Sequence, residues 1–184
     1  MATEIVDSSE YKYRGRIINL RVDQIHTDSG YRGIREIVEH PGAVAIVPID
    51  ERQQIVLVKQ YRSAVGKNTI EVPAGTLSKG EDPLVCAHRE LKEETGYQAA
   101  KLDRIGGVYT APGISSEFIH LYLATGLTAG ESATEEDEAI DLMRVSLNEA
   151  LSMIHDGSIN DAKSVSALLL VKEMIHEGTP KNTK

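Results

Sequence analysis

The 184-residue sequence has very little cysteine, no tryptophan and few aromatic residues of any kind. Its single cysteine, Cys86, excludes an intrachain disulfide and any metal site made of several cysteines, and it favours a reducing compartment, most simply the cytoplasm. Aromatic residues make up 4% of the chain, too few for a platform that stacks single-stranded nucleic acid. With a net charge of −8, the chain also lacks the basic surface that general nucleic-acid binding requires.

Long hydrophobic runs are missing as well. The longest nearly unbroken one, 43–49, is far shorter than the roughly 18 residues that span a bilayer. Residues 1–15 have neither an apolar core nor a basic leader, so we expect no signal peptide. What the sequence does contain is 41% hydrophobic and 26% charged residues, a balance typical of globular proteins. We therefore expect a globular protein without membrane or nucleic-acid partners.

Alternating β-branched residues predict an antiparallel hairpin near the N-terminus. Its two strands, 15–27 and 31–39, flank a turn signal at 28–30. A Pro-Gly pair follows the second strand and indicates a boundary between two parts of the chain. We therefore expect an N-terminal β subregion at 1–40 and a main domain at 41–184.

The main domain mixes strands with helices, which predicts an α/β fold in which helices cover a sheet. The strongest helix is expected at 83–95, where Asp82 is a good N-cap and Gly96 a good C-cap. Two more helices are expected, from Ser146 to about 157 and over 162–176. Strands are expected at 43–49, 54–60, 68–72, 101–109, 117–124 and 139–145.

Three glutamates of the first helix, Glu90, Glu93 and Glu94, fall at i, i+3 and i+4 and therefore share one face. Like charges at this spacing repel, and these stand near the negative end of the helix dipole. The pattern indicates that a cation binds there, and carboxylate oxygens suit Mg²⁺ or Mn²⁺. Arg89 can reach Glu93 at i+4 and fix its rotamer. The alternative is a solvated acidic face paired with Arg89 and Lys92.

The residues around this cluster match the signature of the Nudix hydrolases. That signature reads Gly, five residues, Glu, seven residues, then Arg-Glu-apolar-any-Glu-Glu-any-Gly-apolar. This chain supplies it from Gly75 through Glu81 to the run 89–97. The one departure is Tyr97, where an aliphatic residue is commoner, and it should affect packing rather than chemistry. Gly75 is expected to let the chain turn tightly.

The resemblance to the Nudix family implies a mixed β-sheet sandwiched between α-helices. It also implies hydrolysis of a nucleoside diphosphate linked to another moiety, with Mg²⁺ as the cofactor and Mn²⁺ as a substitute. Glu90 and Glu94 would bind the metal together with the backbone carbonyl of Ala74. Glu93 would be a further ligand or a general base, with Arg89 beside it.

Four segments outside the helix resemble the ADP-ribose pyrophosphatase branch of the family. Pro112 lies sixteen residues after Gly96, a spacing associated with ADP-ribose. Residues 13–17 resemble the strand that a partner subunit exchanges and that helps to hold the adenine, which implies a homodimer with sites built from both chains. The substrate contacts implied are Arg16, Ile17, Glu36 on the base, Arg62 on the phosphates, Glu71 and Glu117 on the ribose, and Pro112.

An acidic loop stands before the last expected strand. In this branch such a loop supplies the carboxylate that activates water, and a Glu-x-Glu spacing makes Glu136 the candidate base and Glu138 the candidate metal ligand. Glu93 is the competing base. A solvated acidic loop is the alternative here, and Arg16 and Arg62 taken alone fit surface ion pairs equally well.

The activity expected from this resemblance is hydrolysis of the pyrophosphate bond of ADP-ribose or a related nucleoside diphosphate sugar. The products would be a nucleoside monophosphate and a sugar phosphate. Two alternatives stay open: the same reaction on another sugar nucleotide, such as GDP-mannose, and a Nudix module that binds nucleotides without catalysis. The second is disfavoured because non-catalytic members usually lose a signature carboxylate, whereas this chain retains them all.

Overall fold

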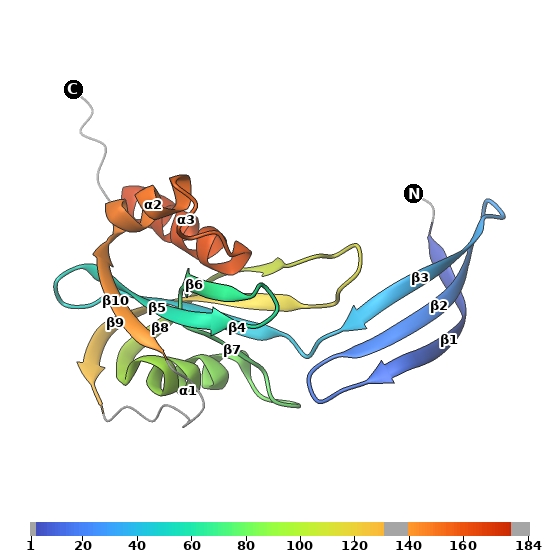
Figure 1. Ribbon diagram of the computed structural model, residues 1–184, viewed down its shortest axis with the longest axis horizontal. Helices are drawn as coiled ribbons and strands as arrows, with labels where there is room; N and C mark the ends of the chain where they lie inside the picture. Colours follow the sequence, from blue (N-terminus) through green and yellow to red (C-terminus); the bar gives the residue numbers. More distant parts are fainter. Residues whose placement is uncertain (1–2, 131–139, 178–184) are drawn as a thin grey trace. The chain divides into compact units, whose positions relative to one another are not determined.

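The computed structural model describes residues 3–130 and 140–177. The chain divides into two compact units, one formed by Met1–Gly42 with Tyr109–Phe118 and the other by Ala43–Val108 with Ile119–Lys184. None of the helices in the described part is long and apolar enough to cross a membrane. The described elements (Figure 1) are β1 (Glu4–Arg14), β2 (Asn19–Thr27), β3 (Arg32–Glu39), β4 (Ala43–Pro48), β5 (Gln54–Arg62), β6 (Lys67–Glu71), β7 (Ala74–Thr76), α1 (Pro83–Thr95), β8 (Tyr97–Tyr109), β9 (Phe118–Ala129), β10 (Asp141–Ser146), α2 (Leu147–His155) and α3 (Ala162–Glu177).

The first unit contains an antiparallel sheet in the order β1-β2-β3. Strands β2 and β3 form the predicted hairpin, in which Ile25 pairs with Gly33. Gly30 takes a φ of 84° in the connecting turn, a conformation that favours glycine. Strand β1 was not predicted, because every one of its residues is exposed and it carries no alternation of buried and exposed positions.

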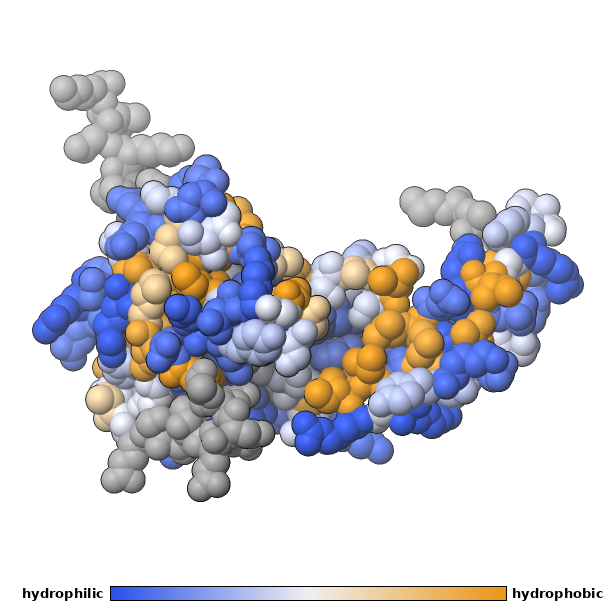
Figure 2. All heavy atoms as spheres, in the orientation of Figure 1, coloured by the Kyte–Doolittle hydropathy of each residue, from blue (hydrophilic) through white to orange (hydrophobic). Residues whose placement is uncertain are grey.

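Apolar side chains lie open on the surface of this first unit. Figure 2 shows hydrophobic residues gathered in a band over the β1–β3 sheet. The exposed large apolar side chains of the first unit include Ile5, Val6, Ile18 and Ile34. Exposed apolar side chains gathered in this way are candidates for an interaction surface.

The second unit confirms the expected mixed sheet between helices. One sheet has the order β7-β4-β9-β8, with β4 and β9 parallel, and the other has the order β10-β5-β6. Within this unit Figure 1 shows α1 on one side of the strands and α2 and α3 on the other. Every residue of β4 is buried, which explains its continuous apolar run.

Alternate residues of β4 serve two hydrophobic cores. Ala45 and Val47 belong to a cluster with Leu168 of α3, whereas Val44 and Ile46 belong to a cluster with residues of α1. This division follows from the two-residue period of a strand. The α1 side of the sheet is therefore anchored directly to the helix that bears the Nudix signature.

Candidate active site

Helix α1 forms as its caps predict and carries the acidic cluster. The Asp82 carboxylate accepts hydrogen bonds from the amides of the first turn, and Gly96 ends the helix with a φ of 71°. Glu94 is 6% exposed and the Glu90 side chain 12%, while the Glu93 side chain is 35% exposed. Two neighbouring carboxylates with so little exposure are costly unless a positive charge compensates them.

The backbone of β7 lies against the carboxylates of both Glu90 and Glu94. The Ala74 amide donates to Oε2 of Glu94 at 3.0 Å. A Cβ on Gly75 would lie 1.8 Å from Cδ of Glu90, so only glycine permits this approach. Gly75 does not have a positive φ, and its role is the close approach to Glu90 rather than the tight turn expected from the sequence.

The expected metal ligands are of a kind that suits a hard divalent cation. Glu90, Glu94 and the carbonyl of Ala74 are all oxygen donors, the kind that Mg²⁺ and Mn²⁺ prefer. Within residues 3–130 and 140–177, no group of three or more His, Cys, Asp or Glu side chains is arranged to hold a metal ion. Glu136 and Glu138, the expected base and further ligand, lie outside the described residues.

Arg89 ties the acidic cluster together. Its Nε and Nη2 donate to the Glu81 carboxylate, each at 3.1 Å. Its Nη1 donates to Glu90 at 2.7 Å and to Glu93 at 2.9 Å, so the contact expected at i+4 is present. Hydrogen bonding from Arg89 lowers the pKa of Glu81 to about 2, and bonding to Glu81 raises the pKa of Arg89. Arg89 is thus a fixed cation that orients three carboxylates.

A second charged network surrounds Glu71 at the end of β6. Arg62 donates to it through Nε at 3.0 Å and Nη2 at 2.7 Å. The hydroxyl of Thr69 and the ammonium of Lys163 also donate to it, each at 2.5 Å. Burial raises the pKa of Glu71, but hydrogen bonds from Arg62 and the charge of Lys163 outweigh it and lower the pKa to about 2.

Within this network, the two residues expected to contact the substrate differ in their exposure to solvent. Glu71, expected on the ribose, is 2% exposed and accepts bonds from three side chains of its own protein. The side chain of Arg62, expected on the phosphates, is 37% exposed. Sequence reasoning missed Thr69 and Lys163, and the one signal for Lys163 was a cation in the first turn of a helix.

The other expected substrate residues belong to the first unit. Four of them are exposed: Arg16, Ile17, Glu36 and Pro112. The Glu117 carboxylate accepts a hydrogen bond from the Thr110 hydroxyl at 2.8 Å and lies 3.6 Å from Nδ1 of His40. The structure therefore brings the signature residues together in the second unit and places the expected base contacts in the first.

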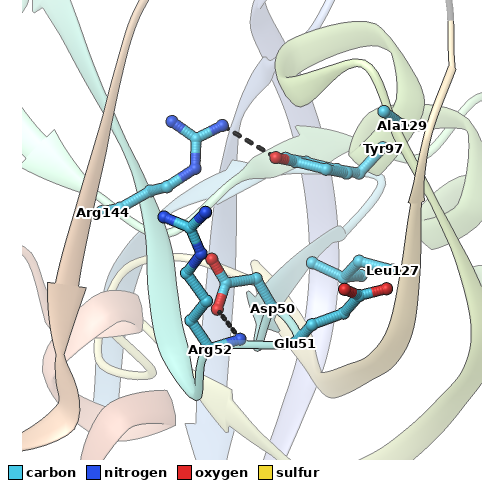
Figure 3. A pocket seen from close by; sticks show the side chains of 7 residues that line it. All are labelled: Asp50, Glu51, Arg52, Tyr97, Leu127, Ala129 and Arg144. Carbon is cyan, nitrogen blue, oxygen red and sulfur yellow. Dashed lines mark hydrogen bonds between the residues drawn. The ribbon is translucent and has the colours of Figure 1, made fainter.

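Tyr97, the departure from the signature, lines a polar pocket. Arg144 donates through Nη2 to its hydroxyl at 2.8 Å (Figure 3). None of the acidic cluster lines this pocket, so Tyr97 adds a polar contact at another surface. The pocket measures about 450 Å³ and is lined by Asp50, Glu51, Arg52, Tyr97, Leu127, Ala129 and Arg144.

Comparison with known proteins places this site in a family. The NUDIX domain matches residues 39–168, and the nucleoside diphosphate sugar hydrolase N-terminal domain matches residues 4–38. A solved structure described as an ADP compounds hydrolase superposes with a TM-score of 0.84 at 26% identity, covering 95% of each chain.

Three curated relatives resemble the chain along most of its length. It is 45% identical to the methanol dehydrogenase activator of Bacillus methanolicus over 162 residues, 87% of this chain and 88% of the relative. It is 40% identical to the ADP-ribose pyrophosphatase of Bacillus subtilis over 172 residues, 91% and 93% of the two chains. It is 35% identical to the GDP-mannose pyrophosphatase of Cronobacter sakazakii over 144 residues, 73% and 75% of the two chains. With the domain match spanning most of the sequence and the signature complete over residues 75–97, this chain belongs to the Nudix hydrolase family.

Proposed function

We propose that this protein hydrolyses the pyrophosphate bond of ADP-ribose or a closely related nucleoside diphosphate sugar. The products are a nucleoside monophosphate and a sugar phosphate. The observation that carries the proposal is the complete carboxylate cluster on α1, with Glu90 and Glu94 against the backbone of β7. The match of residues 4–38 to a nucleoside diphosphate sugar hydrolase domain supports the substrate class. The 40% identity to an ADP-ribose pyrophosphatase, with the position of Pro112, favours ADP-ribose.

The metal in this proposal is Mg²⁺, for which Mn²⁺ can substitute. Glu90, Glu94 and the carbonyl of Ala74 would hold it, with Glu138 as a further ligand. A divalent cation at this place neutralises pyrophosphate charge and lowers the pKa of water. Arg89 keeps the carboxylates oriented through its hydrogen bonds to Glu90 and Glu93, and the fixed arrangement avoids reorganisation during the reaction.

The proton of the attacking water needs an acceptor in this chain. Glu136 is the proposed general base, and Glu93 is its competitor because Arg89 fixes it on the helix. Arg62 is the proposed contact to the pyrophosphate, because a guanidinium can bind phosphate oxygens bidentately. Water attacks one phosphorus atom, and the other phosphate leaves with its sugar or nucleoside.

The first unit is proposed to hold the rest of the substrate within a homodimer. Arg16, Ile17 and Glu36 would contact the base from the partner subunit, and Glu117 would accept hydrogen bonds from ribose hydroxyls. The exposed apolar band over β1–β3 supports association, because it offers a surface for a second copy to cover. Residues 1–40 would then be the exchanged element, and 41–184 the catalytic domain.

Comparative kinetics test this function. Initial rates with Mg²⁺ should be measured for ADP-ribose, GDP-mannose, UDP-glucose and NADH, with the products identified. We expect the highest kcat/KM for ADP-ribose. A preference for GDP-mannose would favour the alternative that the Cronobacter relative supports. A triphosphate such as dGTP turned over faster than every sugar nucleotide would overturn the assignment.

A second candidate function is activation of a dehydrogenase. The 45% identity to a methanol dehydrogenase activator, over 87% of this chain, favours it. Adding the protein to a purified methanol dehydrogenase tests it, with Glu94→Gln beside the wild type. Stimulation by the wild type alone would mean that activation needs the hydrolase site, and no stimulation by either would remove this candidate.

A further inference from the structure

Lys163 stands where the electrostatics of its own helix disfavour a cation. Helix α3 begins at Ala162, so Lys163 lies in the first turn, beside the positive end of the helix dipole. Its side chain is nevertheless held inward, with 14% exposed, and Nζ donates to Glu71 at 2.5 Å and to Asp161 at 2.9 Å. Both the helix dipole and the loss of hydration disfavour a lysine at this position. The stability of α3 therefore does not explain why Lys163 is there.

The contacts of Lys163 lead to Arg62. Oε2 of Glu71 accepts hydrogen bonds from both Lys163 Nζ and Arg62 Nη2, so one buried carboxylate joins the two cations. The neighbouring residues are also tied together, because the Val72 amide donates to the Ser164 hydroxyl at 2.8 Å. The start of α3 is therefore fixed against the end of β6, and the positions of the charged groups are set by the backbone.

The balance of charge in this network decides how much positive charge Arg62 can offer to a ligand. Two cations, Arg62 and Lys163, pair with two carboxylates, Glu71 and Asp161, and the charge of Glu94 also acts on Arg62. Without the charge of Lys163, the remaining groups of the network would carry a net negative charge. Their carboxylates would offset the positive charge of the Arg62 guanidinium and attract it towards the protein interior. With Lys163 present, Arg62 anchors Nε and Nη2 on Glu71, while Nη1 takes no part in that pair.

We propose that Lys163 is a positioning residue for substrate binding, which acts through Glu71 to fix the guanidinium of Arg62 and to preserve its charge for the pyrophosphate. This inference rests on the proposed function, because it takes Arg62 as the pyrophosphate contact. In this proposal Glu71 binds Arg62 and does not contact the ribose of the substrate. Lys163 itself does not touch the substrate.

Kinetics of Lys163→Met and Lys163→Arg with ADP-ribose at saturating Mg²⁺ test the proposal. Loss of the charge should raise KM roughly tenfold and leave kcat within about threefold, because a pyrophosphate contact made equally in the ground and transition states is uniform binding. Lys163→Arg should recover most of the loss. Lys172→Met, on the same helix and outside the network, is the matched control and should behave as wild type.

A double-mutant cycle separates positioning from a merely structural role. In an Arg62→Ala background, Lys163→Met should raise KM by less than about twofold further, because the guanidinium that Lys163 is proposed to position is absent. Thermal unfolding checks each variant, and Lys163→Gln replaces Lys163→Met if the latter does not fold. An unchanged KM, or an equal tenfold rise in the Arg62→Ala background, overturns the inference. If the wild type hydrolyses no sugar nucleotide, the proposed function fails instead.

Discussion

Glu90 and Glu94 lie one helical turn apart against the β7 backbone, so each can be tested by removing charge without changing shape. Glutamine at either position should weaken metal binding, because it removes one negative charge from the donor set. We expect lower activity at limiting Mg²⁺ and partial recovery as Mg²⁺ or Mn²⁺ is raised. A metal titration of the hydrolysis rate measures this. Activity that stays at the wild-type level at limiting metal would remove that residue from the ligand set.

Glu136, the proposed general base, should respond differently to substitution by glutamine. Glu136→Gln should lower kcat by about 10²–10⁴, because proton transfer is lost while substrate and metal affinity stay nearly intact. Added metal should not restore the rate. Glu93→Gln, measured beside it, is the competing case, since Arg89 holds Glu93 on the helix at 2.9 Å. A near-wild-type kcat for Glu136→Gln would move the base role away from that residue.

Glu71 links the buried charge network to stability in acid. Its pKa lies at about 2, below the ordinary value of 4.5. A group with a lowered folded-state pKa stabilises the protein above its unfolded pKa, and that contribution is lost as pH falls through the folded value. Glu71→Gln should therefore destabilise the protein by about 3 kcal/mol near neutral pH. The difference from wild type should shrink as pH falls from 4.5 towards 2. Urea unfolding at several pH values measures it, and a pH-independent difference contradicts it.

At the scale of elements, the site depends on how closely β7 approaches α1. Gly75→Ala would bring a Cβ to 1.8 Å from Cδ of Glu90 and push that carboxylate away. We expect roughly a 10²-fold loss of activity, the size that a displacement of about 1 Å can cause, together with a raised metal requirement. Gly106→Ala is the control, because its Cβ would meet only the end of the Leu170 side chain at 3.1 Å. Equal activity of the two variants would show that the approach is not needed.

Local signals explain which elements the sequence could predict. Helix α1 begins after Asp82 and ends at Gly96 because capping residues act within a few positions, and β4 was visible as an unbroken apolar run. Strand β1 has no buried position and therefore no pattern to find. Strand β7 has three residues, and its pairing with β4 depends on a distant segment. Such contacts leave little trace in a single sequence.

The same reasoning applies to the site. Its helical carboxylates could be predicted because the signature is a continuous stretch. The ion pair between Lys163 and Glu71 joins residues 92 positions apart, and no local spacing encodes it. Burial of Glu71 was equally hidden, because the sequence shows a carboxylate but not the donors that enclose it.

At the scale of the whole molecule, the expected site residues are divided between the two units. Arg62, Glu90 and Glu94 belong to the second, and Arg16 and Glu36 belong to the first. The first unit consists largely of a single three-stranded sheet on which large apolar side chains lie exposed. The proposed homodimer, in which each first unit serves the partner's catalytic domain, would account for both features.

Complementation between two impaired variants, assayed at limiting Mg²⁺, tests this arrangement in the full-length protein. One variant carries Arg16→Ala with Glu36→Ala, and the other carries Glu94→Gln. If each site combines the two chains, a mixed dimer has one doubly damaged site and one intact site. Random exchange of subunits should then restore roughly a quarter of the wild-type activity. Native mass spectrometry confirms the mixed dimer, and each variant incubated alone is the control. Mixed dimers no more active than their parents would mean that each site is built within one chain, and a monomeric wild type would exclude the homodimer itself.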